Sequence, residues 1–240
     1  MRKALIFFLG MFVVNLSASS QSLPVDNFSQ EDLYRLKQLR GDVSPNVSFT
    51  IRPLALPQSR FDSLYNVNDS VGARMELLPD EWKILPFTWQ NQFNSHHPTG
   101  WNDGSMVPAK GLQTFISGGF YQAKGRFSFQ IKPELVFAFN PAFEEFPQDH
   151  YSVIWKFYYN FYNRTDLPVR FGKNPRVRLY PGQSSVRYNV KKLSAGLSTE
   201  NLWWGPGMRN SLLMSNTAPG FLHLTVNTCE PVQTPIGSLE

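Results

Sequence analysis

The cluster with the most suitable chemistry for holding a ligand is Trp101, Asn102 and Asp103. An indole ring can stack on the apolar face of a sugar ring, and the neighbouring amide and carboxylate can hydrogen-bond to its hydroxyl groups. The same residues, followed by glycine, are also typical of a tight structural turn. The sequence therefore leaves two interpretations of this cluster, a carbohydrate-binding loop and a turn without a ligand.

The histidines point to no catalytic or metal site. His96 and His97 are adjacent, and no nearby cysteine or carboxylate completes a set of metal ligands, so a solvated loop is predicted. His223 lies among Ser, Thr and Asn residues, but a hydrolase triad is defined by geometry across a fold rather than by local sequence. The chain carries no phosphate-binding loop, dinucleotide fingerprint or metalloprotease helix. We expect no catalytic residue, no metal and no cofactor.

Composition favours strands that face an apolar environment. Aromatic residues make up 15% of the 240 residues, whereas charged residues make up 17%, below the roughly 25% of typical soluble domains. A membrane β-barrel fits this profile because its outward residues are apolar and its inward residues are polar; a soluble β-sandwich remains open. The net charge of +5 is scattered, which argues against nucleic acid as a partner, and the single Cys229 excludes an internal disulfide.

Residues 1–20 have the features of a secretory signal peptide. Arg2 and Lys3 precede an apolar run over 4–14, and small residues follow at 17–20. The apolar run is shorter than the roughly 20 residues that a transmembrane helix requires. We therefore expect an exported protein.

Residues 21–78 are predicted to form a helical and irregular segment that packs on or in the main body. The sequence over 28–41, FSQEDLYRLKQLRG, predicts a short helix that Ser29 caps and Gly41 ends. A strand-like run at 46–54, NVSFTIRPL, follows it, and the rest shows no sustained period.

Residues 79–240 are predicted to be strands. The clearest alternation is in RFSFQIKPELVFAFN at 126–140, where apolar and polar residues alternate and Pro133 marks a bulge or an edge. Four further strands are expected in WKILPFTWQNQFN, KGLQTFISGGFYQ, YSVIWKFYYNFYN and LPVRFGKNPRVRLY. Aromatic residues near the strand ends suggest girdles at the two bilayer interfaces; they are Trp82, Trp89, Tyr121, Tyr151, Tyr162 and Tyr180.

The segment from Lys191 to Glu240 contains the most distinctive motif. A shift in the apolar phase at Lys191 and Lys192 predicts a tight turn between two strands, and a new alternating strand begins at Leu222. Between them, the sequence GLSTENLWWGPGMRNSLLMSNTAP predicts a structural corner at its Trp-Trp-Gly-Pro-Gly motif. The residues that carry the motif are Trp203, Trp204, Gly205, Pro206, Gly207, Asn210, Ser215, Asn216 and Pro219.

This motif resembles the core signature of the capsule assembly protein Wzi family in its Bacteroidota version. The segments SFTIRPL (48–54), NDGSMVPAKGLQ (102–113) and KPELVFA (132–138) also resemble that family. The resemblance implies an antiparallel transmembrane β-barrel of the outer-membrane type, with about 18 strands and an N-terminal helical element. It further implies a lectin-like, non-enzymatic protein that assembles or attaches capsular polysaccharide at the cell surface, with outer-membrane lipids and the barrel-assembly machinery as its other partners.

The resemblance itself assigns no sugar-binding residue; from their chemistry alone, Trp101, Asn102 and Asp103 are the candidate polysaccharide-binding residues. At about 9–11 residues a strand, 79–240 supplies about half of the family's barrel, so we expect the chain to be the N-terminal half of a longer protein. A porin-like or uptake channel of the outer membrane is the alternative function. A barrel enzyme that uses His223 ranks last.

Overall fold

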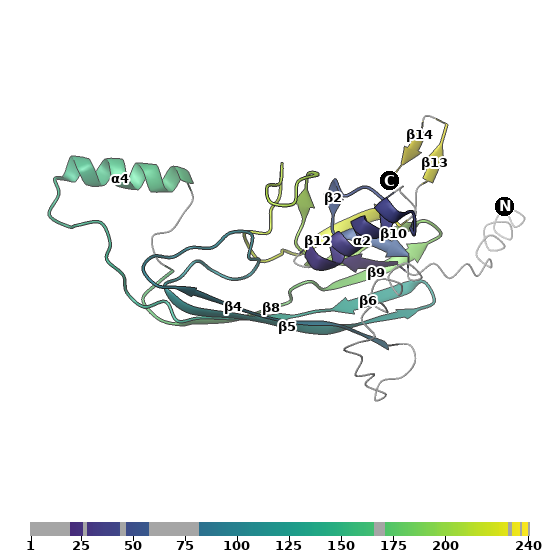
Figure 1. Cartoon of the computed structure of the whole chain (residues 1–240), viewed down its shortest axis with the longest axis horizontal. Coiled ribbons are helices and arrows are strands. Elements are labelled where there is room, and N and C mark those ends of the chain that lie inside the picture. Colours follow the sequence, from purple (N-terminus) through teal and green to yellow (C-terminus); the bar gives the residue numbers. More distant parts are fainter. Residues whose placement is uncertain are drawn as a thin grey trace, which may run out of the picture.

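A computed structural model describes residues 20–25, 28–43, 47–57, 82–165, 171–229, 232–235 and 237–239. The predicted signal peptide, most of the predicted irregular stretch before residue 79 and the cap residue Ser29's side chain lie outside what is described. The described residues are mostly antiparallel strands with two helices (Figure 1). In chain order the elements are β1 (Ser20–Leu23), α2 (Phe28–Arg40), β2 (Ile51–Arg52), β3 (Leu54–Pro57), β4 (Trp82–Asn94), β5 (Gly111–Lys124), β6 (Phe127–Ile131), β7 (Glu134–Ala138), α4 (Ser152–Thr165), β8 (Arg176–Tyr180), β9 (Ser185–Val190), β10 (Leu193–Ser198), β11 (Trp203–Trp204), β12 (His223–Thr228), β13 (Val232–Thr234) and β14 (Gly237–Leu239).

Eight of these strands form one antiparallel sheet, in which some strands pair with partners that are not adjacent in sequence. β4 pairs with β5, and the other edge of β5 pairs with both β6 and β7. β6 then pairs with β9, and β7 pairs with β8. β10 and β12 extend the sheet beyond β9. Within the described chain the sheet is open, and β4, β8 and β12 each pair on one side only. The predicted all-β class is confirmed at this level.

Pro133 separates β6 from β7, as the sequence predicted. Proline lacks the N–H group that the ladder requires, so pairing with β5 lapses there and resumes at Glu134. Gly119 lies opposite this interruption, and a Cβ atom on it would fall 1.9 Å from the carbonyl oxygen of Ile131. Glycine is therefore required for the two strands to approach.

The two ends of the sheet differ in the length of their connections. At one end, residues 125–126 join β5 to β6 and residues 191–192 join β9 to β10. The second of these is the tight turn predicted from the phase shift, with Lys191 at a φ of 53°. At the other end, residues 95–110, 139–175 and 199–222 form long connections. We call this the long-connection end.

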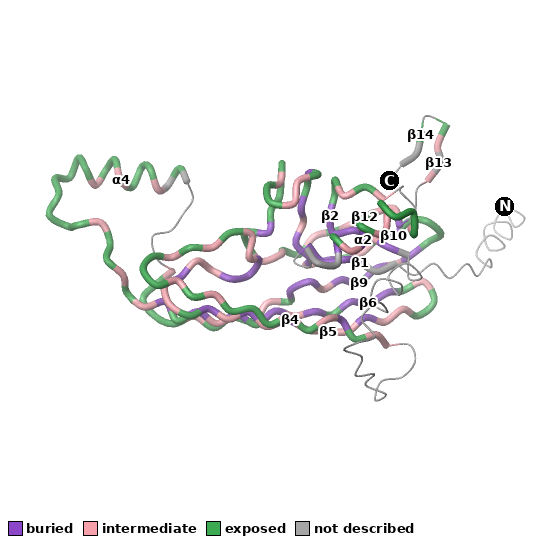
Figure 2. The backbone as a smooth tube through the Cα atoms, in the orientation of Figure 1, coloured by how far each residue is buried: buried purple, intermediate pink, exposed green. Residues whose placement is uncertain are grey.

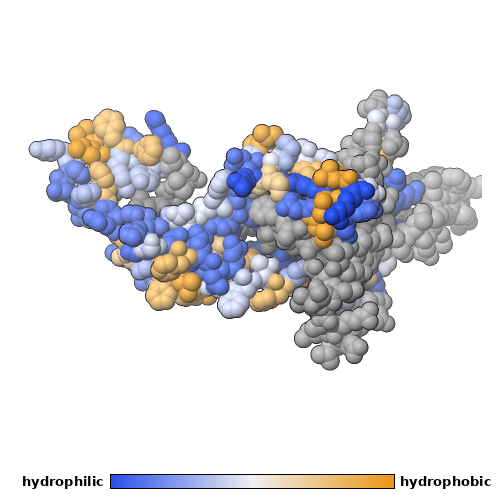
Figure 3. All heavy atoms as spheres, in the orientation of Figure 1, coloured by the Kyte–Doolittle hydropathy of each residue, from blue (hydrophilic) through white to orange (hydrophobic). Residues whose placement is uncertain are grey.

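The two faces of the sheet differ in polarity, and most of the buried side chains on its strands are polar. Figure 2 shows where the buried residues lie along the strands. On β9, Ser185, Arg187 and Asn189 are buried, whereas Val186 and Val190 are exposed. The exposed face is apolar across the sheet, whereas the buried face is mainly polar and also carries an apolar cluster of Phe115 and Val136 with Met106. The large apolar side chains exposed on its strands are Ile84, Phe87, Trp89, Phe93, Leu112, Phe127, Ile131, Leu135, Val177, Leu179, Val186, Val190, Leu193, Leu197, Leu224 and Val226. Figure 3 shows apolar side chains along the edge of the molecule where the sheet lies.

The N-terminal segment has a small core of its own. Helix α2 forms where it was predicted and ends at Gly41, whose φ of 80° suits a helix C-terminus. Tyr34 of α2 packs with Leu23, Leu54 and Leu56, which lie on the paired strands β1 and β3. This unit lies over the polar face of the sheet (Figure 1).

One predicted strand is wrong. The segment YSVIWKFYYNFYN forms helix α4 rather than a strand, because its apolar residues also recur at helical spacing and no strand pairs with it. Tyr151 and Tyr162 therefore do not belong to a strand-end girdle. Tyr121 also departs from the prediction, since it is buried on the polar face of β5, and Trp89 lies in the middle of β4. Neither described helix is long and apolar enough to span a bilayer.

Candidate functional site

The predicted ligand cluster lies in the long connection between β4 and β5, where it docks on the connection that carries the Trp-Trp-Gly-Pro-Gly motif. The Asn102 side chain donates a hydrogen bond of 2.7 Å to the carbonyl oxygen of Arg209. In return, Asn216 donates to the carbonyl oxygen of Asn102 at 3.1 Å, and Thr217 donates to its side-chain oxygen at 3.3 Å. The structure thus joins Asn102 to Asn216, two residues predicted for different roles.

Asn102 holds the conformation of a turn, whereas Trp101 remains available. The backbone of Asn102 has a φ of 54°, and its amide is occupied by the contacts above. Asp103 is half-buried, and burial raises the pKa of its carboxyl group above the usual range, opposed by backbone hydrogen bonds from Asp103 and Trp101. Trp101 is 64% exposed at the edge of this turn. Of the three, the indole is the group with a free surface for stacking.

An arginine from the N-terminal segment binds the Trp-Trp-Gly-Pro-Gly motif; we call this set of contacts the clasp. Arg52 is fully buried, and its guanidinium donates to the carbonyl oxygens of Gly205 and Gly207 at 3.1 and 2.5 Å. It also lies over the Trp203 ring, at 5.0 Å from the ring centroid. The Trp203 indole N–H donates to the carbonyl oxygen of Gly207 at 2.9 Å. These contacts close the loop on itself, so the motif forms a corner.

Glu31 of helix α2 is the counter-ion of Arg52. The two side chains are both buried and lie 2.9 Å apart, and Arg35 approaches the same carboxylate oxygen at 3.6 Å. Burial raises the pKa of Glu31, and the Arg52 charge opposes this rise. One strand pair, β2 with β11, continues the clasp through the backbone. Helix α2, β2 and the motif are therefore held as one unit.

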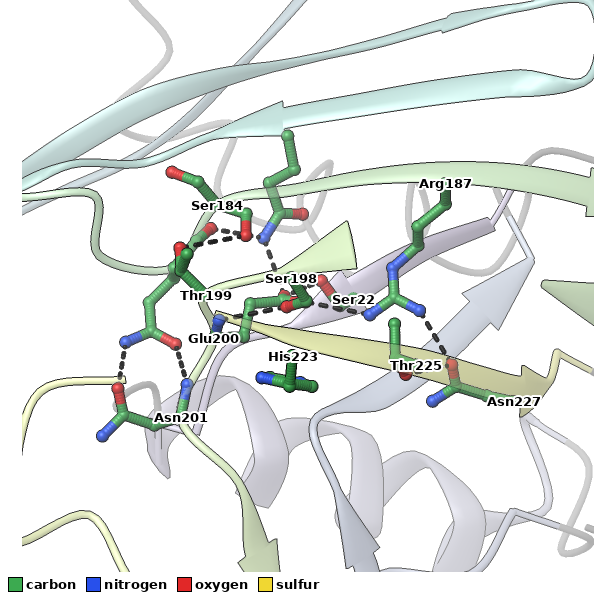
Figure 4. Close-up of polar contacts among 12 residues, drawn as sticks. Ser22, Ser184, Arg187, Ser198, Thr199, Glu200, Asn201, His223, Thr225 and Asn227 are labelled. Carbon is green, nitrogen blue, oxygen red and sulfur yellow. Dashed lines mark hydrogen bonds and ion pairs between the residues drawn. The ribbon is translucent and has the colours of Figure 1, made fainter. Parts of the chain in front are cut away.

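A second ion pair fixes the polar face of the sheet (Figure 4). Glu200 is fully buried, and its Oε2 atom accepts from Arg187 at 2.9 Å and from Ser198 at 2.8 Å. Its Oε1 atom accepts from Gln130 at 3.1 Å and from Ser22 of β1. Both carboxylate oxygens are therefore occupied by protein donors. This arrangement stabilises the charge and attaches β1 to the sheet, and it leaves no lone pair directed at solvent.

Gln183 continues this network toward the motif. Its side chain donates to Glu134 at 2.8 Å and to Asn201 at 2.9 Å, and it accepts from the Asn201 N–H at 3.0 Å. The Asn201 amide in turn donates to the carbonyl oxygen of Ala218 at 2.6 Å. The two ends of the connection over 199–222 are thereby joined to each other, and Gln183 attaches them to the polar face.

The histidines His96, His97 and His223 each contact different residues. His223 lies on the polar face of β12 in Figure 4, and its Nδ1 atom is 2.8 Å from the carbonyl oxygen of Phe221. His96 contacts Ser95, and His97 packs edge-on against Phe143. Across the described residues, no three His, Cys, Asp or Glu side chains are grouped to hold a metal ion.

The remaining residues of the motif have mixed environments. Asn216 is buried, and its backbone carbonyl accepts from the Gly104 N–H at 2.8 Å. Ser215 bonds to Thr217 at 2.8 Å, Asn210 is exposed and Pro219 is half-buried. Trp204 is exposed at the same end of the molecule as Trp101, and its backbone pairs with Leu213.

A comparison with protein-family models, curated proteins and solved structures found no match.

Sequence reasoning missed the charged residues that hold these loops. Arg52 and Glu31 are 21 residues apart in the chain, and neither stands in a pattern that predicts burial. Glu200 follows the last residues of β10 and looks like a solvated turn residue. The one available signal was that Arg52 and Glu200 both lie inside segments of the family resemblance.

Proposed function

We propose that the sheet is part of the wall of an outer-membrane β-barrel, with its apolar face against lipid. Sixteen large apolar side chains are exposed on its strands. Because full burial of one such side chain is worth about 1.5–3 kcal/mol, transfer of this face from water to hydrocarbon is worth tens of kcal/mol. Net stabilities of soluble domains are about 5–15 kcal/mol. Contact with lipid would therefore stabilise the sheet by a free energy that is not available in water. The apolar exposed face is the observation that carries the proposal.

The long-connection end is the end that faces the cell exterior in this proposal. Outer-membrane barrels have short turns on the periplasmic side and longer loops on the outside. The turns at 125–126 and 191–192 would then lie in the periplasm, where the barrel-assembly machinery acts during insertion. The connections at 95–110, 139–175 and 199–222 would lie outside.

The function that these features support best is assembly or surface attachment of capsular or extracellular polysaccharide. The protein would act as a lectin rather than an enzyme. Trp101 supports this proposal because its exposed indole lies on the external side, on a turn that Asn102, Arg209 and Asn216 hold rigid. A preorganised aromatic surface binds with a smaller loss of conformational entropy. The resemblance of the two docked loops to the Wzi capsule-assembly family supports the polysaccharide as ligand.

Deletion of the gene tests this function. We expect surface-retained polysaccharide to fall while total synthesis stays constant, because an attachment protein acts after synthesis. Complementation with W101A should restore the protein level but not full retention, whereas H96A, an exposed residue of the same connection, should restore both. If the capsule stayed attached in the deletion strain, the proposed function would be wrong.

A porin-like channel is the second candidate, and one observation favours it. Arg178 is exposed on the same side of β8 as the polar face, where a charged side chain could line a pore. The N-terminal unit, however, lies over that face: Ser22 donates to the buried Glu200, and Arg52 donates to Gly205 in the connection over 199–222. Ion conductance of the purified protein in planar bilayers decides this point, and we expect little or none.

A further inference from the structure

Two neighbouring hairpin turns, opposite the long-connection end of the sheet, carry basic residues that the proposed function does not use (right-hand end of the sheet in Figure 1). The turns lie side by side because β6 pairs with β9, and the Asn189 N–H donates to the carbonyl oxygen of Arg126 at 2.7 Å. We call residues 124–126 and 191–192 the basic turns. Their charged residues are Lys124, Arg126, Lys191 and Lys192.

No acidic residue accompanies these charges in the described strands that flank them. The sequence contains no Asp or Glu over 120–129, 185–195 or 223–229. The last of these ranges lies beside the turns, because the Cys229 N–H donates to the carbonyl oxygen of Lys192 at 2.8 Å. The two turns and these strands therefore carry charge of one sign, and such a surface attracts ligands of the opposite sign.

The basic turns border the apolar face of the sheet directly. Lys124 pairs with Phe127 on β6, and Phe127 pairs with Tyr188 on β9. Side chains of directly paired residues lie on the same side of an antiparallel sheet, so Lys124 shares the side of the exposed Phe127. The Phe127 and Tyr188 rings lie 5.0 Å apart, and Arg126 donates to the Tyr188 hydroxyl at 3.2 Å. Charged and aromatic groups thus lie together at this border.

A second aromatic pair lies at the same end of the sheet. Trp82, the first residue of β4, meets Phe120 edge-on at 4.9 Å between ring centroids. Trp and Tyr are enriched where hydrocarbon gives way to lipid headgroups. Along the strands, the apolar side chains are followed by aromatic ones and then by Lys124 and the other charges of the basic turns. This order matches hydrocarbon, interface and headgroup in a bilayer.

From this arrangement we infer that the basic turns bind the phosphate groups of anionic phospholipids in the leaflet on their side of the membrane. The inference rests on the proposed membrane location. Long Lys and Arg side chains can extend from an apolar surface to the level of the headgroups. There they donate charge-assisted hydrogen bonds to phosphate oxygens. Clusters of about four or more Lys or Arg beside a membrane-spanning segment attract anionic lipids in this way.

The position of Lys124 favours lipid over an acidic protein as the partner. A protein that docked on the tips of the hairpins would meet Lys191 and Lys192, which are both exposed. Lys124 is also exposed, but it lies on the apolar side of β5, next to Phe127. A phospholipid can contact the apolar side with its acyl chains and Lys124 with its phosphate group at the same time.

Lipid-selective quenching tests the inference. The full chain carrying C229S and a fluorescent label at L193C, beside the basic turns, is reconstituted in phosphatidylcholine vesicles. An equal small fraction of nitroxide-labelled phosphatidylglycerol or nitroxide-labelled phosphatidylcholine is added. We expect phosphatidylglycerol to quench about twofold more strongly than phosphatidylcholine, because the turns concentrate anionic lipid. A label at L112C, at the other end of the apolar side of β5, is the matched position and should show little preference.

Charge variants identify the source of the preference. K124Q/K191Q removes two charges from the basic turns and should reduce the preference at position 193 by roughly half or more. High salt should have a similar effect because it screens the attraction. K156Q/R164Q removes two exposed charges from α4 and should leave the preference unchanged. The heat-modifiable band on a gel verifies that each variant is folded.

The outcomes separate this inference from the proposed function. Equal quenching by the two lipids at position 193 would leave the membrane location intact and show the inference to be wrong. Absence of quenching at both 193 and 112 would overturn the membrane location and the inference together. A preference that persists in K124Q/K191Q or in high salt would exclude the basic turns as its source. Loss of the preference on addition of inorganic phosphate at constant ionic strength would assign the turns to free phosphate and overturn the inference.

Discussion

The two faces of the eight-stranded sheet differ in which kind of side chain is covered and which is exposed. The face that the N-terminal unit covers carries an ion pair, amides and hydroxyls, of which Arg187, Glu200, Ser198 and Gln130 are hydrogen-bonded to one another. The uncovered face carries Val, Leu, Ile and Phe side chains, with Leu179 73% exposed. A soluble sheet normally buries its apolar face. This comparison supports the proposal that the uncovered face lies against lipid and that the polar face points to the interior of a barrel.

Removal of the buried carboxylate should give the largest effect. We expect E200A to lower the free energy of unfolding by about 3–5 kcal/mol, because Arg187 would remain buried without its counter-ion. Denaturant unfolding in lipid vesicles measures the change. The double variant R187M/E200L removes both charges and should recover most of the loss. A loss below about 1 kcal/mol for E200A would mean that the polar face is open to water.

A charge on the apolar face should give the next largest effect. L179R should cost about 2–4 kcal/mol, the value for arginine at the lipid face of a barrel, and should reduce the heat-modifiable, folded band in membranes. R178Q changes the neighbouring residue on the opposite side of β8 and is the control, with little expected change. If Leu179 faced water, L179R would stay within about 0.5 kcal/mol of the unaltered protein.

The clasp on the motif should respond to loss of the guanidinium. R52K keeps the charge but cannot reach Glu31, Gly205 and Gly207 together, so we expect a loss of about 1.5–3 kcal/mol, the range for hydrogen bonds to charged groups. Limited proteolysis near residues 205–212 should become faster. R35K, which alters the more exposed partner of Glu31, should cost below about 1 kcal/mol. Equal losses for the two variants would show that the clasp is not specific to Arg52.

The pH dependence of stability should show the smallest effect. Burial raises the pKa of Glu31 above the ordinary value of 4.5, so the folded protein binds the proton more tightly than the unfolded chain does. The stabilisation linked to this proton is complete below pH 4.5 and is lost as pH rises through the folded pKa. E31Q should remove this slope from the stability curve above pH 4.5. A slope unchanged in E31Q would assign it to other carboxyl groups.

The sequence predicted the strands whose alternation is regular and failed where the same residues suit two structures. Alternation over 126–140 identified β6, β7 and the break at Pro133, because period two leaves no helical alternative. The segment at 151–163 failed because its aromatic residues lie so densely that they satisfy both periods. The helix at 28–40 was predictable from its start and stop signals.

The site was less predictable than the sheet, because its contacts join residues far apart in the chain. Trp101 to Asp103 could be selected for their chemistry, but the docking of Asn102 on Arg209 and Asn216 spans more than a hundred residues. The partners of Glu200 come from four separate parts of the chain. Local patterns contain no information on such pairings, which depend on the topology of the sheet.

The most direct test of the proposal that the sheet faces lipid is the solvent accessibility of adjacent positions on β8. Spin labels at R178C and L179C, each in a C229S background and reconstituted in bilayers, report collision with oxygen, which concentrates in lipid, and with a water-soluble nickel complex. We expect the label at position 179 to relax with oxygen and not with nickel, and the label at position 178 to show the reverse. Equal access of nickel to both labels would contradict the inverted polarity on which the account depends.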